Sequence, residues 1–222
     1  LGLYTFPVYH EQPERIPVLR RKVANLIERA GLGSDSFDGR VLRQVLASFP
    51  RNQLFQAPDD ELLDVALRVT YNRERKRQLV FVRRDPYGLF CTCLVYTPRE
   101  RYNTQLRERM QAVLVEELEA LDAEFTTYFS ESVLVRTHFV LRVDPERQIA
   151  YDEARIARRI RELARDWEDV LREALVQAHG EERARRELIR YARGLPAGYR
   201  ERFNVRAAAH DIEHMERLTH SG

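Results

Sequence analysis

Two histidines near the end of the sequence have the spacing of a metal-binding pair. The segment His210-Asp211-Ile212-Glu213-His214 matches the pattern H-x-x-E-H of the inverted zinc peptidases. Histidines four residues apart share one helix face, so both rings can reach one Zn²⁺ ion. A catalytic zinc also needs a third protein ligand, which that class supplies far downstream, and only eight residues follow His214. We therefore expect a solvated, charged helix and no metal ligand, with a metal-dependent hydrolase on His210, Glu213 and His214 as a remote alternative.

The two cysteines of the chain, Cys91 and Cys93, lie two residues apart in an apolar segment. A disulfide between residues so close on one extended strand is sterically unfavourable. With no further cysteine, the disulfide framework of a small secreted protein is excluded. We expect both thiols to pack in a core as small hydrophobic groups.

Three basic side chains fall on one face of the segment 133–143. Arg136, His138 and Arg142 alternate there with apolar residues, and residues two apart on a strand point the same way. Cationic groups on a sheet face can bind an anion, or they can pair with acidic residues of another domain. The sequence therefore predicts a candidate ligand or interface face at Arg136, His138 and Arg142, with ion pairing as the commoner outcome.

The sequence contains none of the common catalytic or nucleotide-binding motifs. There is no G-x-G-x-x-G after a strand, no P-loop and no G-x-S-x-G. We therefore assign no catalytic and no cofactor-binding residue. Aromatic residues of the predicted sheet, Phe90, Tyr96 and Tyr128, would suit base stacking in an RNA- or single-stranded-DNA-binding module with an RRM-like sheet. The stretch 87–92 departs from the RNP1 pattern, so packing is favoured and nucleic-acid binding is the alternative function.

Composition excludes several classes of protein. Among 222 residues, 44% are hydrophobic and the net charge is +2, which argues against disorder. The balance of 37 basic and 35 acidic residues argues against a dedicated nucleic-acid binder. We find neither a signal peptide nor an apolar run of roughly 18 residues, so we expect a cytoplasmic protein without membrane contact. Because the chain starts at Leu1 and not at Met, we also expect a piece of a longer polypeptide.

Hydrophobic periodicity predicts an α+β block between two helical segments. Helices are expected at 17–30 and 41–48 before it, and at 156–180, 181–193 and 205–219 after it. Within the block, helices are expected at 58–77 and 97–120, the second opened by a capping box at 97–100. Strands are expected at 79–82, 89–96, 124–129 and 133–143, the first two joined by a type I turn at 85–88.

The predicted block reads α-β-β-α-β-β between residues 58 and 143. Moving its last strand to the front gives β-α-β-β-α-β, which is the ferredoxin-like order. We therefore predict a four-stranded antiparallel sheet with one face buried by the two helices, plus helical extensions at both ends. The corresponding domains are 1–57, 58–145 and 146–222.

Several long segments resemble the N-terminal half of the large bacterial NAD-specific glutamate dehydrogenases. The similar segments are 16–23, 49–56, 81–88, 96–104, 129–132, 136–139 and 167–175. Long runs of this kind are more specific than a short motif, and together they extend over nearly the whole chain. The resemblance implies an ACT-like version of the ferredoxin-like fold, because such enzymes carry ACT-like domains in that half.

The resemblance also implies a function for the parent enzyme. These dehydrogenases oxidatively deaminate glutamate to 2-oxoglutarate and ammonia with NAD, and their catalytic Lys and Asp and nucleotide fold lie later in the polypeptide. No catalytic residue is therefore carried over, and NAD is expected only in the parent. The resemblance implies a non-catalytic regulatory or oligomerisation segment, with the rest of its own polypeptide, further copies and an amino-acid effector as partners. The element order departs from the usual ACT order, so no standard ACT ligand site is transferred.

Overall fold

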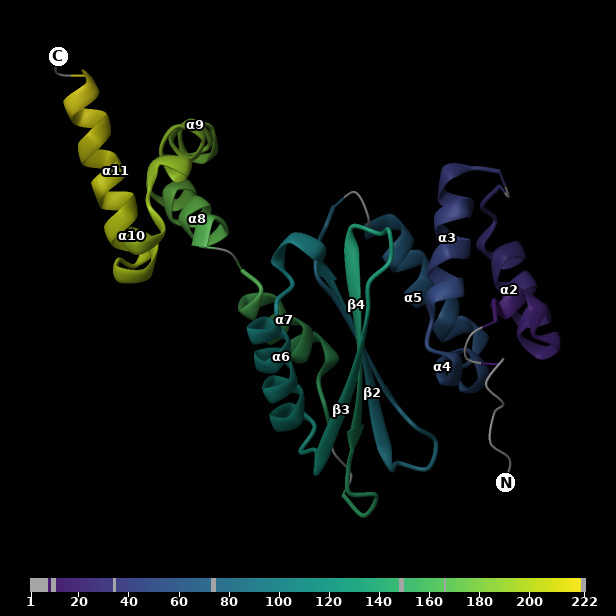
Figure 1. Cartoon of the computed structure of the whole chain (residues 1–222). Coiled ribbons are helices and arrows are strands. Elements are labelled where there is room, and N and C mark those ends of the chain that lie inside the picture. The colour runs from purple at the N-terminus through teal and green to yellow at the C-terminus, as the bar shows by residue number, and fades with distance from the viewer. Residues whose placement is uncertain are drawn as a thin grey trace. The chain divides into compact units, whose positions relative to one another are not determined.

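The computed structural model describes residues 8, 11–33, 35–72, 75–147, 150–165 and 167–220 (Figure 1). The chain divides into two compact units, Leu1–Leu163 and Ala164–Gly222. Each unit has its own apolar core, so each is described by itself.

The first unit is built on a four-stranded antiparallel sheet. Its strands are β1 (Leu79–Arg84), β2 (Phe90–Pro98), β3 (Asp122–Tyr128) and β4 (Leu134–Arg142), in the spatial order β1-β2-β4-β3. The register places Leu94 of β2 between Phe81 of β1 and His138 of β4. His138 in turn lies beside Thr126 of β3. β2 and β4 are therefore the central strands, and β1 and β3 are the edges.

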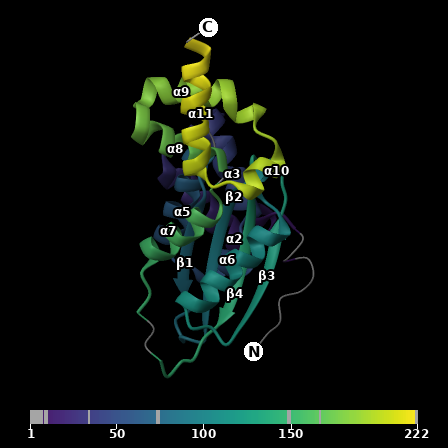
Figure 2. The same ribbon diagram turned by 90° about the vertical axis from the view of Figure 1, so that its left-hand side faces the viewer.

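One face of the sheet is covered by α6 (Thr104–Glu117) and α7 (Glu153–Leu163) (Figure 2). The β4 residues that the sequence predicted to share a face are buried here, with Phe139 and Leu141 both 0% exposed. The helices meet them with an apolar stripe at three- and four-residue spacing. Its buried members are Leu106, Met110, Val113, Leu114, Ile156 and Ile160. The apolar residues at every second position of β4 thus pack against the apolar stripes of α6 and α7.

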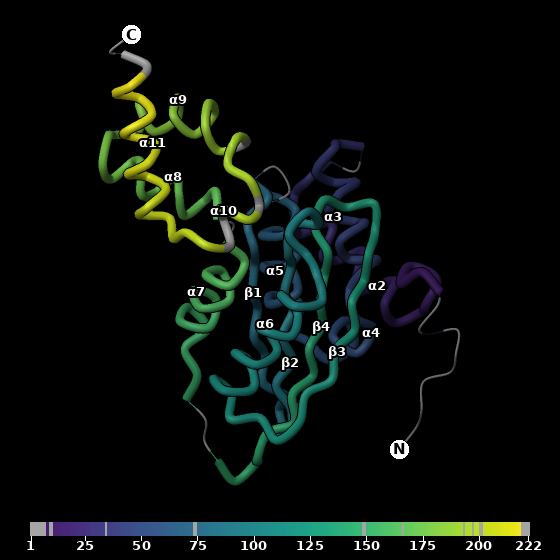
Figure 3. Tube along the Cα trace, turned by 60° about the vertical axis from the view of Figure 1, so that its left-hand side comes forward, coloured from purple at the N-terminus to yellow at the C-terminus, as the bar shows by residue number. Residues whose placement is uncertain are grey.

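The opposite face of the sheet is covered by an earlier group of helices (Figures 1 and 3). They are α2 (Pro17–Ala30), α3 (Phe37–Ser48), α4 (Arg51–Gln56) and α5 (Asp59–Asn72). Their apolar side chains form one cluster with Phe81, Leu94, Tyr96 and Leu134 of the sheet. This cover lies over β1, β2 and the start of β4, whereas β3 stays largely exposed.

The topology confirms the α+β, ferredoxin-like prediction and corrects its helix assignment. The domain reads β-β-α-β-β-α, and moving β1 to the end restores the ferredoxin-like order. The predicted helix 58–77, observed as α5, is not the partner of α6, because its buried Leu62, Ala66 and Val69 join the cluster of α2 and α3. The second helix on the α6 face is α7, which begins after residue 145. The division into 1–57, 58–145 and 146–222 stays a prediction.

Local signals explain several element boundaries. Pro17 opens α2, and Gly31 closes it in the left-handed region with φ 64°. The turn between β1 and β2 forms as predicted, with the Gly88 amide donating to the Asp85 carbonyl at 3.0 Å and Gly88 at φ 71°.

The predicted capping box at 97–100 is wrong. Thr97 is a buried strand residue whose hydroxyl accepts from Gln78, and Asn103 caps α6 by accepting from the Leu106 amide.

The second unit is helical. It contains α8 (Trp167–His179), α9 (Glu181–Tyr191), α10 (Ala197–Arg202) and α11 (Val205–His220), around the buried residues Leu171, Leu175, Ala184, Ala192, Ala208 and Ile212. The predicted helix 156–180 is interrupted, because α7 ends at Leu163 and α8 starts at Trp167. The short helices α4 and α10 were not predicted.

The charged side chain of Glu187 is buried in the second unit at 2% exposure. Its carboxylate lies 2.7 Å from Nδ1 of His179 and accepts from Nε of Arg183 at 2.8 Å. A buried carboxylate needs such partners, because an unpaired charge in a core is strongly destabilising.

Among the helices that the structure describes, none has the length and apolar character that a membrane crossing requires.

We predict that Phe139→Ala lowers the free energy of unfolding of the sheet unit by about 3–5 kcal/mol, because it empties a fully buried site. Phe125→Ala is the matched control. Phe125 lies directly opposite Phe139 on β3 and is 45% exposed, so its loss should cost less than half as much. Urea unfolding followed by the NMR signals of β2 and β4 measures both. Equal costs would contradict the burial that the structure assigns to this face.

Candidate functional site

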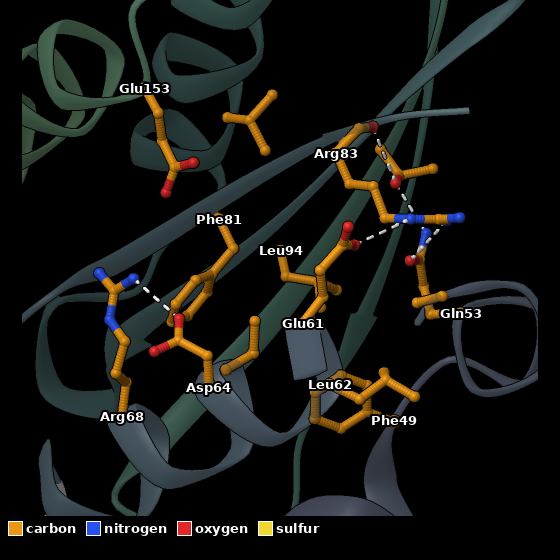
Figure 4. A pocket seen from close by; sticks show the side chains of 14 residues that line it. Phe49, Gln53, Glu61, Leu62, Asp64, Arg68, Phe81, Arg83, Leu94 and Glu153 are labelled. Carbon is orange, nitrogen blue, oxygen red and sulfur yellow. Dashed lines mark hydrogen bonds and ion pairs between the residues drawn. The ribbon is translucent and has the colours of Figure 1, made fainter. Parts of the chain in front are cut away.

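A pocket of about 300 Å³ opens between the early helices and the sheet (Figure 4). Its walls come from α4, α5, β1, β2 and the start of α7. The side chains labelled in Figure 4 are Phe49, Gln53, Glu61, Leu62, Asp64, Arg68, Phe81, Arg83, Leu94 and Glu153. The residues span more than 100 positions of sequence, so only the fold brings them together.

The floor of this pocket is apolar. Phe81 and Leu94 are register partners on β1 and β2, and they point toward the early helices. Phe49 and Leu62 from the helical layer complete the floor, and all four are at most 7% exposed. An apolar floor with a few charged groups at the rim is typical of small-molecule sites.

The charged groups at the rim form two ion pairs. Nε of Arg83 lies 3.3 Å from Oε2 of Glu61, and Nη1 of Arg83 donates to Oε1 of Gln53 at 3.2 Å. Arg68 lies 3.3 Å from Asp64, and its guanidinium sits 4.6 Å from the centre of the Phe81 ring. These mutual contacts hold the rim in one arrangement without a ligand.

Glu153 adds a further carboxylate at the first residue of α7 (Figure 4). Burial raises its pKa above the ordinary value, Arg68 opposes that shift, and Asp64 adds to it. A cationic group of a ligand would relieve the desolvation of this carboxylate. Carboxylates and guanidinium groups around an apolar floor suit the binding of a small molecule that has both a charged and an apolar part.

Sequence reasoning missed this pocket, although part of its signal was present. Glu61, Asp64 and Arg68 recur at three- and four-residue steps, which places them along one face of α5. Acidic residues near the start of a helix are also common as partners of the helix dipole, so this pattern alone does not indicate a site. Arg83 and Glu153 come from other elements, and no local pattern connects them to α5.

The predicted face at Arg136, His138 and Arg142 is divided by the helical layer. Arg136 is 8% exposed and lies beneath that layer, with its guanidinium 5.0 Å from the centre of the Tyr128 ring. His138 is half-buried, and Arg142 is exposed at the end of β4. Arg136 and His138 are close enough to interact electrostatically. Arg142 lies four residues further along the strand, which is roughly 13 Å, so the three do not form one site.

Other side chains with reactive potential lie elsewhere. Cys91 and Cys93 are free and buried, and burial raises the pKa of both thiols. The Nε2 atoms of His210 and His214 lie 3.0 Å apart on an exposed face of α11. Within the described ranges, no group of three His, Cys, Asp or Glu residues could hold a metal ion.

The aromatic residues weighed for base stacking do not share one exposed surface. Tyr96 is buried at 4% exposure, whereas Phe90 and Tyr128 are 40% and 43% exposed. Tyr96 instead packs edge-on against Phe81 inside the core cluster. A stacking platform requires accessible rings, so Tyr96 cannot serve as one.

We predict that His138 makes the sheet unit sensitive to mild acid. Burial, with a smaller contribution from Arg136, lowers the His138 pKa from 6.5 to about 4. Between those values the unfolded chain binds a proton that the folded chain rejects, so stability falls as pH decreases from 6.5 to 4. The loss is at most about 3 kcal/mol.

The measurement compares urea unfolding of the wild type and His138→Gln at pH 7 and pH 4.5. The variant should lose part of the pH dependence, because glutamine does not titrate. His210→Asn, which removes an exposed imidazole, should retain it. An identical pH profile for wild type and His138→Gln would show that His138 titrates normally.

Comparison with known proteins covers most of the chain. Residues 79–168 match the family model "Glutamate dehydrogenase, ACT2 domain", residues 16–75 match "helical motif 1" and residues 174–218 match "helical motif 2" of the same enzyme. The matches give no support to the nucleic-acid alternative.

Curated relatives agree with these models. The chain is 44% identical to the NAD-specific glutamate dehydrogenase of Pseudomonas aeruginosa and 41% identical to that of Halomonas elongata, over 99% and 98% of its residues. It is 31% identical to the Mycobacterium tuberculosis enzyme over 99% of its residues. It spans 14% of the length of each relative. The chain belongs to the family of NAD-specific glutamate dehydrogenases and contains their ACT2 domain flanked by helical motifs 1 and 2.

Proposed function

We propose that this chain is a non-catalytic regulatory and assembly segment of an NAD-specific glutamate dehydrogenase. The parent enzyme would oxidatively deaminate glutamate to 2-oxoglutarate and ammonia, and NAD would bind elsewhere in its polypeptide. One observation carries the proposal: an ACT2 domain is matched between two helical motifs of that enzyme. Its first partner is accordingly the remaining polypeptide of the same enzyme.

The 300 Å³ pocket supports a regulatory role. Its volume lies at the lower end of the range for small-ligand sites, which suits a ligand of amino-acid size. Glu153 would receive the ammonium group, and the floor at Phe81 and Leu94 would receive an apolar part. The ion pairs Glu61–Arg83 and Asp64–Arg68 would exchange partners with the ligand and so couple its binding to the packing of α5 on the sheet.

The β3 edge supports an assembly role. β3 pairs with β4 on one side and is the last strand of the sheet, so its other side presents unpaired backbone groups. Apolar side chains lie along and beside it, with Leu121 64%, Phe125 45% and Phe129 54% exposed. An edge with exposed apolar side chains favours pairing with a second copy.

We predict that the isolated 222-residue chain produces no NADH from glutamate and NAD, because the catalytic residues and the nucleotide-binding fold would lie in another part of the parent enzyme. Absorbance of NADH at high protein concentration measures turnover. Calorimetry of the same sample with glutamate and with other amino acids measures the effector. Turnover above that of a buffer control would refute the non-catalytic assignment, and no heat with any amino acid would refute the effector.

We also predict that the double variant Leu121→Lys/Phe125→Lys reduces self-association, because charges on an edge strand oppose strand pairing. Sedimentation velocity over a range of concentrations measures the mass. Tyr87→Lys is the control, since Tyr87 is 83% exposed in the turn between β1 and β2, at the other edge of the sheet from β3. A monomeric wild type, or an unchanged mass in the double variant, would contradict assembly through β3.

A further inference from the structure

A second, smaller cavity of about 30 Å³ lies between α3 and the sheet. It is distinct from the 300 Å³ pocket and shares no lining residue with it. Its walls come from α3, α5, β2, β3, the β3–β4 loop and β4. The lining residues are Val41, Gln44, Val45, Ser48, Val69, Tyr96, Tyr128, Ser130, Ser132, Leu134 and Arg136.

Two buried polar groups in this cavity lack hydrogen-bond partners. Arg136 is 8% exposed, and no described residue accepts from its Nε or Nη1. Tyr96 is 4% exposed, and its hydroxyl also finds no partner among the described residues. Buried polar groups are nearly always hydrogen-bonded, so two of them facing one cavity indicate a further group inside it.

Within the described ranges, no carboxylate is paired with the charge of Arg136 in this cavity. None of its lining residues is acidic, and Arg51 lies near enough to add positive potential at Arg136. Burial lowers the Arg136 pKa, but a guanidinium in a protein stays protonated. The Tyr128 ring, 5.0 Å away, offers a cation–π contact and carries no charge to neutralise it. A buried charge without a counterion is strongly destabilising.

Two serines provide further donors at the side of the cavity. Oγ of Ser130 accepts from the Ser132 amide, and Oγ of Ser132 accepts from the Leu134 amide, each at 3.2 Å. Both hydroxyl hydrogens therefore remain able to donate to another acceptor. Ser48 is different, because its hydroxyl donates to the Val45 carbonyl at 2.7 Å. Arg136, Tyr96, Ser130 and Ser132 therefore provide donors around the cavity, in addition to Gln44 and Tyr128 at its rim.

We propose that this cavity binds a small anionic group, a carboxylate or an inorganic ion of similar size, held by Arg136 and Tyr96. A water molecule needs roughly 10–15 Å³ of such space, so 30 Å³ admits a chloride ion or a carboxylate and excludes a whole amino acid. Tyr128 and Gln44 at the rim are exposed, so an organic acid can extend from there to solvent. This inference does not depend on the proposed regulatory function.

The test measures the thermal midpoint of the whole chain at constant ionic strength and pH 7 in three salts. Sodium chloride and sodium formate supply anions that fit the cavity, and sodium 2-(N-morpholino)ethanesulfonate supplies one that does not. The midpoint should rise saturably with chloride or formate relative to the bulky anion, because ligands that bind only the folded state stabilise it. A response to formate alone identifies a carboxylate site, and a response to both identifies a site for small anions in general.

Variants assign the response to the cavity. Arg136→Met should abolish it, and Tyr96→Phe should weaken apparent affinity about tenfold, since a hydrogen bond to a charged group contributes roughly 1.5 kcal/mol. Arg109→Met is the control, because it removes the same charge from an exposed position on α6 and should leave the response intact.

Two results would overturn the proposal. One is a wild-type midpoint that is the same in all three salts, which would mean that water satisfies Arg136. The other is an equal loss of response in Arg109→Met and Arg136→Met, which would mean general screening of charge. If Arg136→Met does not fold, Tyr96→Phe and the broadening of the chloride NMR signal by wild-type protein carry the same test.

Discussion

The fold of the first unit depends on burying the two central strands on both faces. In β4, Phe139 is 0% exposed on one face and Arg136 is 8% exposed on the other. A sheet covered on one side only would leave the second face in water. The helices that precede the sheet and the helices that follow its hairpins must therefore lie on opposite sides. The early helical layer is thus part of the same folded body as the ferredoxin-like sheet.

Much of this arrangement follows from the sequence, and the exceptions have a common cause. Alternation along 133–143 predicted the strand and the face of Phe139, because side-chain direction in a strand is a local property. The partner of α5 was not predictable in the same way. Its apolar stripe, with Leu62 and Val69, shows that a surface must cover it, but not which surface. The same holds for α7, whose buried residues Ile156 and Ile160 pack against the sheet. Its apolar stripe predicted a helix but did not show that the helix covers the sheet beside α6.

The candidate sites show the same limit more sharply. Period two placed Arg136 and His138 on one face, and the structure agrees that they are close. Arg136 and His138 are less exposed than Arg142 because α3 covers one end of β4 and leaves the other end open. The sequence of β4 alone does not indicate which end is covered. The large pocket is still less local, since Glu61, Arg83 and Glu153 come from three elements.

The two cavities also differ in how their charges are balanced, and this difference determines what each can recognise. In the large pocket, Arg83 and Arg68 are already paired with carboxylates, so an anionic part of a ligand must displace these pairs, whereas the Glu153 carboxylate can attract a cationic part. In the small cavity, no described carboxylate is paired with Arg136, so an anion would add a charge-assisted bond without breaking one. Because α3 and β4 both line this cavity, an anion bound there would contact both elements and stabilise the packing of α3 on the sheet. The small cavity therefore suits an anion, and the large pocket suits a ligand with a cationic and an apolar part.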